Sequence, residues 1–104
     1  MKEKDTALVR YGVLVRGRVH GVGFRFEAAR RAQHLHLSGF VANCPAGVYI
    51  EAEGPAATVK EFLRSLEARP PVFARVNSLQ RTQLPAHGKN GDFEIRHDLS
   101  APTP

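Results

Sequence analysis

Apolar and polar residues change their spacing several times along the chain, and each change predicts a new element. Residues 7–16 alternate between the two kinds, which predicts a strand with one buried face. Three glycines between residues 17 and 23 make an extended helix unfavourable there. Over residues 24–37 the apolar positions recur at helical spacing, and Ser38-Gly39 is predicted to end this helix.

The second half of the chain repeats this succession of strands and a helix. Residues 40–43 and 47–53 predict two short strands joined by a compact turn. A helix follows, with Pro55 in its first turn, where the missing N–H costs nothing, and Pro70-Pro71 ends it. The remaining elements are two strands at residues 72–82 and 93–95, with a polar loop at 83–91 between them.

The element order β-α-β-β-α-β is that of an α+β, ferredoxin-like sandwich. This fold has a largely antiparallel sheet with both helices on one face. We expect one domain over residues 1–104, with its core at about 7–97 and a disordered tail at 98–104. Four aromatic side chains are expected in the core: Phe24, Phe26, Phe40 and Phe62.

Composition limits the expected cellular location and the classes of binding partner. No apolar run approaches the roughly 20 residues of a membrane span, and the first residues form no secretory signal, so we expect a cytoplasmic monomer. The net charge of +5 suits an anionic partner, which could be nucleic acid, a membrane surface or a phosphorylated small molecule. Cys44 is the only cysteine, and the close pair His34 and His36 point to different helix faces, so no metal site is predicted.

The candidate chemistry lies at residues 17–25, Gly-Arg-Val-His-Gly-Val-Gly-Phe-Arg, between a strand and a helix. Glycines there allow successive backbone N–H groups to converge on an anion, and the helix N-terminus adds its own N–H groups. Arg25 could grip two phosphate oxygens with its planar guanidinium. The alternative is a sharp turn with Arg25 in solvent, and these residues alone favour neither. The spacing fits neither a Walker loop nor a dinucleotide-binding loop.

This segment resembles the active-site signature of the acylphosphatases, G-x-V-[Q/H]-G-V-x-[F/Y]-R. Residues 39–43, Gly-Phe-Val-Ala-Asn, are similar to the second motif of that family, G-x-V-x-N, and the similarity extends over about residues 8–96. The resemblance implies the ferredoxin-like fold. It also implies hydrolysis of acyl phosphates to a carboxylate and inorganic phosphate, by in-line attack of water on phosphorus.

The family roles carry over to matching positions. The resemblance implies that Arg25 binds the phosphate and that Asn43 orients the attacking water. Because the signature accepts glutamine at position 20, His20 is interpreted as shaping the loop and not as an acid or base; Cys44 is interpreted as a buried structural thiol. The expected ligands are a small acyl phosphate and inorganic phosphate, without cofactor or metal. The backbone N–H groups implied to bind phosphate are those of Val19, His20, Gly21, Val22, Gly23 and Phe24.

Two alternatives remain. The compact turn after Asn43 and the ending at residues 93–96 are similar to the acylphosphatase-like N-terminal domain of hydrogenase-maturation carbamoyltransferases, which handles carbamoyl phosphate. Phe26, where those domains usually have proline, and the chain end at Pro104 favour a stand-alone enzyme. An RNA-binding module of the same fold would carry aromatic residues in a characteristic strand pattern, and no segment matches it, so nucleic acid is not expected as a partner.

Overall fold

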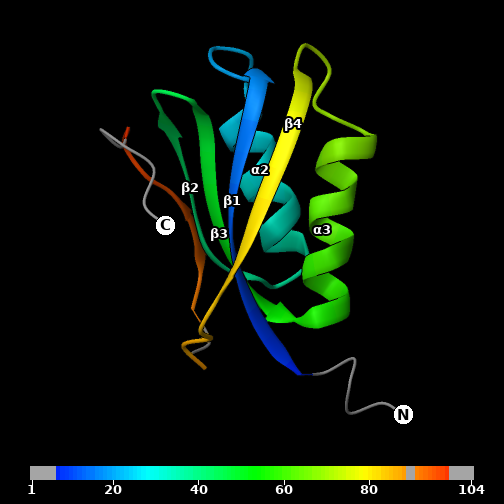
Figure 1. Ribbon diagram of the computed structural model, residues 1–104, viewed down its shortest axis with the longest axis vertical. Helices are drawn as coiled ribbons and strands as arrows, with labels where there is room; N and C mark the ends of the chain where they lie inside the picture. The colour runs from blue at the N-terminus through cyan, green and yellow to red at the C-terminus, as the bar shows by residue number, and fades with distance from the viewer. Residues whose placement is uncertain (1–6, 89–90, 99–104) are drawn as a thin grey trace.

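The computed structural model describes residues 7–88 and 91–98, which form a five-stranded sheet and two helices (Figure 1). The strands lie in the order β4-β1-β3-β2-β5. The elements in chain order are β1 (Leu8–Arg18), α2 (Phe24–His34), β2 (Ser38–Cys44), β3 (Gly47–Pro55), α3 (Ala56–Ala68), β4 (Arg75–Leu84) and β5 (Phe93–Ile95).

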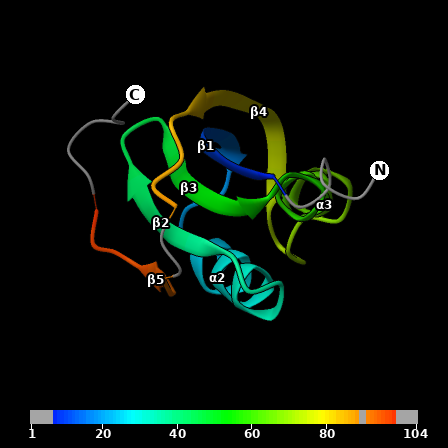
Figure 2. The same ribbon diagram turned by 90° about the horizontal axis from the view of Figure 1, so that it is seen from below.

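The sheet confirms the predicted fold class. β1 pairs with β3 and β4, and β2 with β3, all antiparallel, while the short β5 pairs in parallel with β2. Both helices lie on the same side of the sheet (Figure 2). Alternation along β1 sends Val13 and Val15 into the core, whereas Leu14 packs on the opposite face against a smaller cluster that includes Phe40 and Tyr49. The alternating pattern in residues 7–16 therefore corresponds to side chains that point to opposite faces of the sheet.

The core prediction holds for Phe24 and Phe62, which are buried beneath the helices, and for Phe40, which is buried on the other face of the sheet. It is wrong for Phe26, whose side chain is 66% exposed. The buried positions of α2 include Phe24 and Ala28, and a residue midway between them points to the opposite side of a helix with 3.6 residues per turn.

Several predicted boundaries move. The first helix ends at His34 and not at Leu37, because His36 adopts a left-handed backbone with φ 59° that turns the chain into β2. Pro55 immediately precedes α3 and does not lie in its first turn. β4 begins three residues later than predicted and extends to Leu84, while Val72, counted in the alternating run, is exposed in the preceding turn.

A bulge in β1 leads into the candidate loop. The register with β4 shifts between Arg16 and Gly17, and Gly17 has a φ of 139°. A Cβ on Gly17 would lie 2.1 Å from the carbonyl oxygen of Arg75, so only glycine allows the two strands to approach this closely. The predicted tail lies outside the described residues from 99 onward. Neither helix formed by the described residues is long and apolar enough to cross a membrane.

Candidate functional site

The loop at residues 19–24 connects β1 to α2 and is anchored at both ends by side chains in the core. Val19 and Phe24 are each almost fully buried. Between them, Gly21 and Gly23 have φ values of 70° and 79°, and a Cβ on either would meet no atom within 4 Å. These glycines are therefore required by backbone conformation and not by crowding, and the surface above them is open. We call this segment the 19–24 loop.

The N-terminus of α2 faces out of this loop. The first hydrogen bond of the helix runs from the N–H of Glu27 to the carbonyl oxygen of Gly23, at 3.1 Å. The N–H groups of the preceding helical residues have no partner within the helix, as at any helix start. Together with the positive end of the helix dipole they favour an anion.

His20 fastens the 19–24 loop to the turn between β2 and β3. Its Nε2 donates a hydrogen bond to the carbonyl oxygen of Gly47, with the two atoms 2.5 Å apart. Gly47 itself is packed against β1, since a Cβ there would lie 2.0 Å from the carbonyl oxygen of Val15. The interpretation of His20 as a loop-shaping residue fits this contact, which links the first motif to the residue that begins β3.

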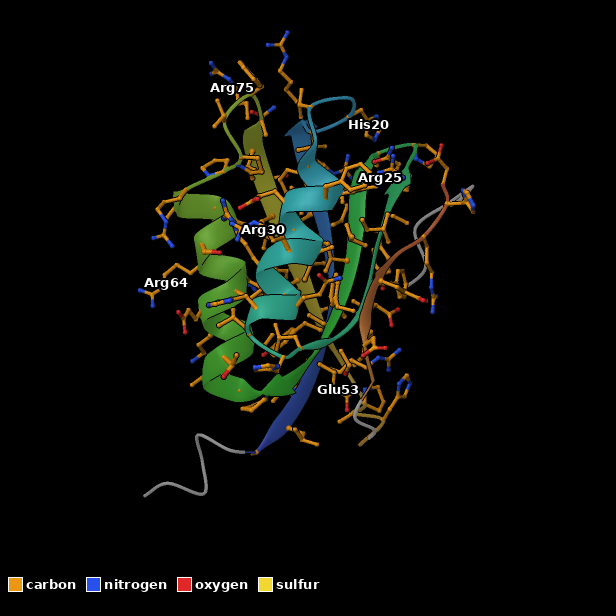
Figure 3. All side chains as sticks on the ribbon, turned by 180° about the vertical axis from the view of Figure 1, so that it is seen from behind. His20, Arg25, Arg30, Glu53, Arg64 and Arg75 are labelled. Atoms are coloured by element: carbon orange, nitrogen blue, oxygen red, sulfur yellow. The ribbon has the colours of Figure 1, made fainter. Side chains whose placement is uncertain are left out.

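Arg25 lies in the first turn of α2, at the same end of the molecule as His20 (Figure 3). Its side chain is 29% exposed, and its Nη1 lies 3.9 Å from Oδ1 of Asp98. Asp98 belongs to the segment that follows β5. Arg25 is thus partly held by its surroundings and still open to a ligand, and it is not the fully solvated side chain of the alternative interpretation.

Asn43 is the penultimate residue of β2, where it pairs with the buried Val48. Its side-chain oxygen Oδ1 is buried and accepts no hydrogen bond from any described residue. Buried polar atoms almost always have a partner, so this oxygen is suited to bind a ligand or water. An open pocket of about 340 Å³ runs beside it, lined by His20, Asn43, Cys44, Pro45 and Asp98.

Comparison with known proteins shows which family this chain belongs to. The family model described as Acylphosphatase matches residues 11–95. The chain belongs to the acylphosphatase family. An acylphosphatase from Synechococcus sp. (strain WH7803) is 46% identical over 97 residues, which cover 91% of this chain and 95% of that protein. The crystal structure of acylphosphatase from Bacillus subtilis superposes with a TM-score of 0.79 at 31% identity, covering 85% of this chain and 98% of that one.

A larger protein also contains a similar region. Carbamoyltransferase HypF from Rhizobium leguminosarum bv. viciae is 40% identical over 99 residues, which cover 94% of this chain but 12% of that protein. The acylphosphatase-family chain therefore spans about one eighth of that relative. These similarities agree with the resemblance to both kinds of protein found in the sequence.

The first carboxylate after the first motif, that of Glu27, forms ion pairs along the helix. Hydrogen bonds from Arg30 and then Arg31 hold the pKa of Glu27 down at about 2, against an ordinary value of 4.5. Glu27 is therefore ionised at neutral pH and engaged along the helix, with its Oε2 2.7 Å from a nitrogen of each arginine. It is not poised to donate or accept a proton in catalysis.

Two further residues complete the description of the pocket. Cys44 is buried, as expected for a structural thiol. Asp98 was assigned to a disordered tail, and the structure instead places it beside Arg25 and in the pocket of Asn43. No local pattern marks Asp98, because its position depends on how the chain leaves β5. Among residues 7–88 and 91–98 no three histidine, cysteine or acidic side chains gather in a way that could hold a metal ion.

Proposed function

We propose that this chain hydrolyses acyl phosphates to a carboxylate and inorganic phosphate, with Arg25 binding the phosphate and Asn43 orienting the attacking water. The observation that carries the assignment is the buried side-chain oxygen Oδ1 of Asn43, which has no partner among the described residues. Asn43 lines the same pocket as His20 and Asp98, and Asp98 is the neighbour of Arg25. Family membership supports the reaction.

Phosphate binding is assigned to the 19–24 loop together with Arg25. Backbone N–H groups from Val19 to Phe24 and the start of α2 would surround the phosphoryl oxygens, and Arg25 would add a charge-assisted pair of hydrogen bonds. These groups stabilise charge on the equatorial oxygens of the transition state, which is the main requirement for phosphoryl transfer. A bound phosphate would replace Asp98 as the anion nearest Arg25.

Water activation is assigned to Asn43. Its side-chain oxygen Oδ1 would accept a hydrogen bond from one O–H of a water molecule and so direct the water's lone pair at phosphorus. As the new P–O bond forms, the bond from phosphorus to the acyl oxygen breaks, and its electron pair leaves on the carboxylate. The water's proton passes to a phosphate oxygen. A carboxylate is a weak base, so the leaving group needs no general acid.

The test of this function is a comparison of two substrates. The leaving group of benzoyl phosphate is a carboxylate, whereas that of a phosphate monoester such as para-nitrophenyl phosphate is a more basic oxyanion, whose departure gains from an acid. We expect rapid phosphate release from benzoyl phosphate and little from the monoester. Equal rates on both substrates, or no release from benzoyl phosphate, would refute the proposal.

A second candidate function rests on the similarity to carbamoyltransferase HypF. The same site would then act on carbamoyl phosphate as one domain of a larger protein. A kcat/KM for carbamoyl phosphate well above that for benzoyl phosphate would favour this alternative. We propose acylphosphatase activity in the first place, because the acylphosphatase from Synechococcus matches over nearly the full length of both chains. We also propose that the protein acts as a stand-alone cytoplasmic monomer.

A further inference from the structure

Two arginines face each other across the strands that lead into the 19–24 loop. Arg18 and Arg75 are the last register pair of β1 and β4, and both side chains are exposed. Cα atoms of paired residues in antiparallel strands lie about 5 Å apart. Arg18 directly precedes the loop in sequence, and Arg75 lies at the same end of the molecule as His20 and Arg25 (Figure 3).

The strand backbones that carry these two arginines approach each other closely at Gly17. Gly17, next to Arg18, is pressed against the carbonyl oxygen of Arg75 and the amide nitrogen of Asn77, which would lie 2.1 Å and 2.8 Å from a Cβ at position 17. The bulge in β1 therefore holds the two arginine backbones side by side. Their proximity is a property of the rigid sheet and not of a variable loop.

Within the described part of the chain neither arginine has an acidic partner. The ion pairs that form there involve other arginines, namely Arg10, Arg25, Arg30, Arg31 and Arg96. Like charges directly opposite each other destabilise a pair of strands. An anionic ligand that binds between Arg18 and Arg75 would remove this repulsion.

The order of the strands says which part of a substrate would reach this pair. Asn43 lies on β2, which is separated from β1 by β3, while Arg75 lies on β4, on the other side of β1. In-line displacement puts the attacking water and the leaving group on opposite sides of phosphorus. With water on the β2 side, the acyl group points toward β4.

We propose that Arg18 and Arg75 form a binding site for the acyl part of the substrate, and that the preferred acyl phosphates carry a second negative charge on that part, such as a carboxylate. This inference rests on the proposed function, because it takes the position of the acyl group from the role of Asn43. The pair of guanidiniums would hold the distal carboxylate while the 19–24 loop and Arg25 hold the phosphate.

The test uses two substrates that differ only at the distal end, benzoyl phosphate and 4-carboxybenzoyl phosphate. The kcat/KM of each is measured at 0.15 M salt, which screens charges farther away than about 8 Å. The proteins are the wild type, the double variant Arg18→Gln/Arg75→Gln and the control Arg64→Gln. Arg64 is an exposed arginine of α3, away from the active-site end (Figure 3), and its replacement removes a charge without touching the pair.

We expect the wild type to prefer the carboxylated substrate by about fivefold or more, the size of one or two exposed ion pairs. The double variant should bring this ratio to about one, mainly through KM, and Arg64→Gln should keep it. The double variant should also unfold at a higher temperature than the wild type, because a like-charge pair is gone. A purely structural role for these arginines would give a lower unfolding temperature instead.

Three results would overturn the inference: a wild-type ratio near one, a ratio that survives in the double variant, or an equal loss of the ratio in Arg64→Gln. The last result would mean that overall charge, and not the pair, attracts the substrate. If the wild type hydrolyses neither substrate, the proposed function itself fails. If it hydrolyses both at equal rates, only the acyl site fails.

Discussion

The ring of His20 donates a hydrogen bond to the carbonyl oxygen of Gly47, and this contact joins the two halves of the proposed site. His20 belongs to the loop that would hold phosphate, and Gly47 begins β3, directly after the turn that follows Asn43 and Cys44. The spacing between the 19–24 loop and Asn43 is therefore set by this hydrogen bond together with the pairing of β1, β3 and β2.

Replacing His20 should show whether this residue shapes the loop or acts as an acid or base. We predict that His20→Ala lowers kcat/KM for benzoyl phosphate about fivefold, the equivalent of about 1 kcal/mol for one lost hydrogen bond. His20→Gln should restore most of the activity, since an amide N–H can donate to the same carbonyl. The measurement is kcat/KM between pH 5 and 8. An activity that is lost in both variants would instead make His20 an acid or base.

Glu27 makes a prediction about stability as a function of pH. Because its pKa is lowered to about 2 in the folded chain, its ion pairs with Arg30 and Arg31 stabilise the fold above pH 4.5. This contribution is lost as the pH falls through the range from about 4.5 to 2. Glu27→Gln should lower the free energy of unfolding at pH 7 by about 1 kcal/mol or less, the sum expected of one i,i+3 and one i,i+4 ion pair on a helix.

The measurement for Glu27 is urea unfolding at pH 7 and at pH 2.5. Glu61→Gln is the matched control, an exposed glutamate of α3 that forms no ion pair with another described residue. We expect the difference between Glu27→Gln and wild type to shrink at the lower pH, and turnover of Glu27→Gln to stay near wild type at pH 7. A large loss of turnover in a folded Glu27→Gln would show that this carboxylate takes part in the reaction.

The proposed site uses backbone N–H groups, Arg25 and Asn43, and assigns no step to a metal ion. We predict that hydrolysis of benzoyl phosphate survives EDTA, and that inorganic phosphate inhibits competitively because it binds where the substrate phosphate binds. Initial rates with and without chelator, and over a series of phosphate concentrations, measure both effects. Activity that disappears with EDTA and returns with a divalent ion would require a different site.

Much of the fold could be predicted from the sequence because local signals and tertiary packing agree there. The alternation in β1 and the apolar stripe of α3 correspond directly to buried faces. The core prediction is wrong for Phe26 because hydrophobicity alone does not say which side of a helix a residue occupies. The strand prediction is wrong for Val72 because the alternating pattern begins before the strand pairing does. β4 begins where Arg75 meets Arg18, and that long-range register has no local signal.

In the site, too, features within one sequence motif could be predicted, whereas contacts between distant segments could not. The glycines at 21 and 23 and Arg25 lie in one continuous motif, so their proximity could be predicted from the chain itself. The contact of His20 with Gly47 and the position of Asp98 depend on how β2, β3 and the segment after β5 meet, which no window of sequence reveals. That the side-chain oxygen Oδ1 of Asn43 has no partner among the described residues is likewise visible only after the strands are assembled.

The most direct test of the site compares Arg25→Gln with Asn43→Ala in turnover and in competitive inhibition by phosphate. Arg25 is proposed to contact phosphate throughout the reaction, so Arg25→Gln should weaken phosphate binding about tenfold or more and lower turnover as well. Asn43 is proposed to act on water, so Asn43→Ala should lower turnover on the order of 10²-fold with phosphate affinity nearly unchanged. Circular dichroism should show both variants folded. Normal turnover in Asn43→Ala, or full phosphate affinity in Arg25→Gln, would contradict this assignment.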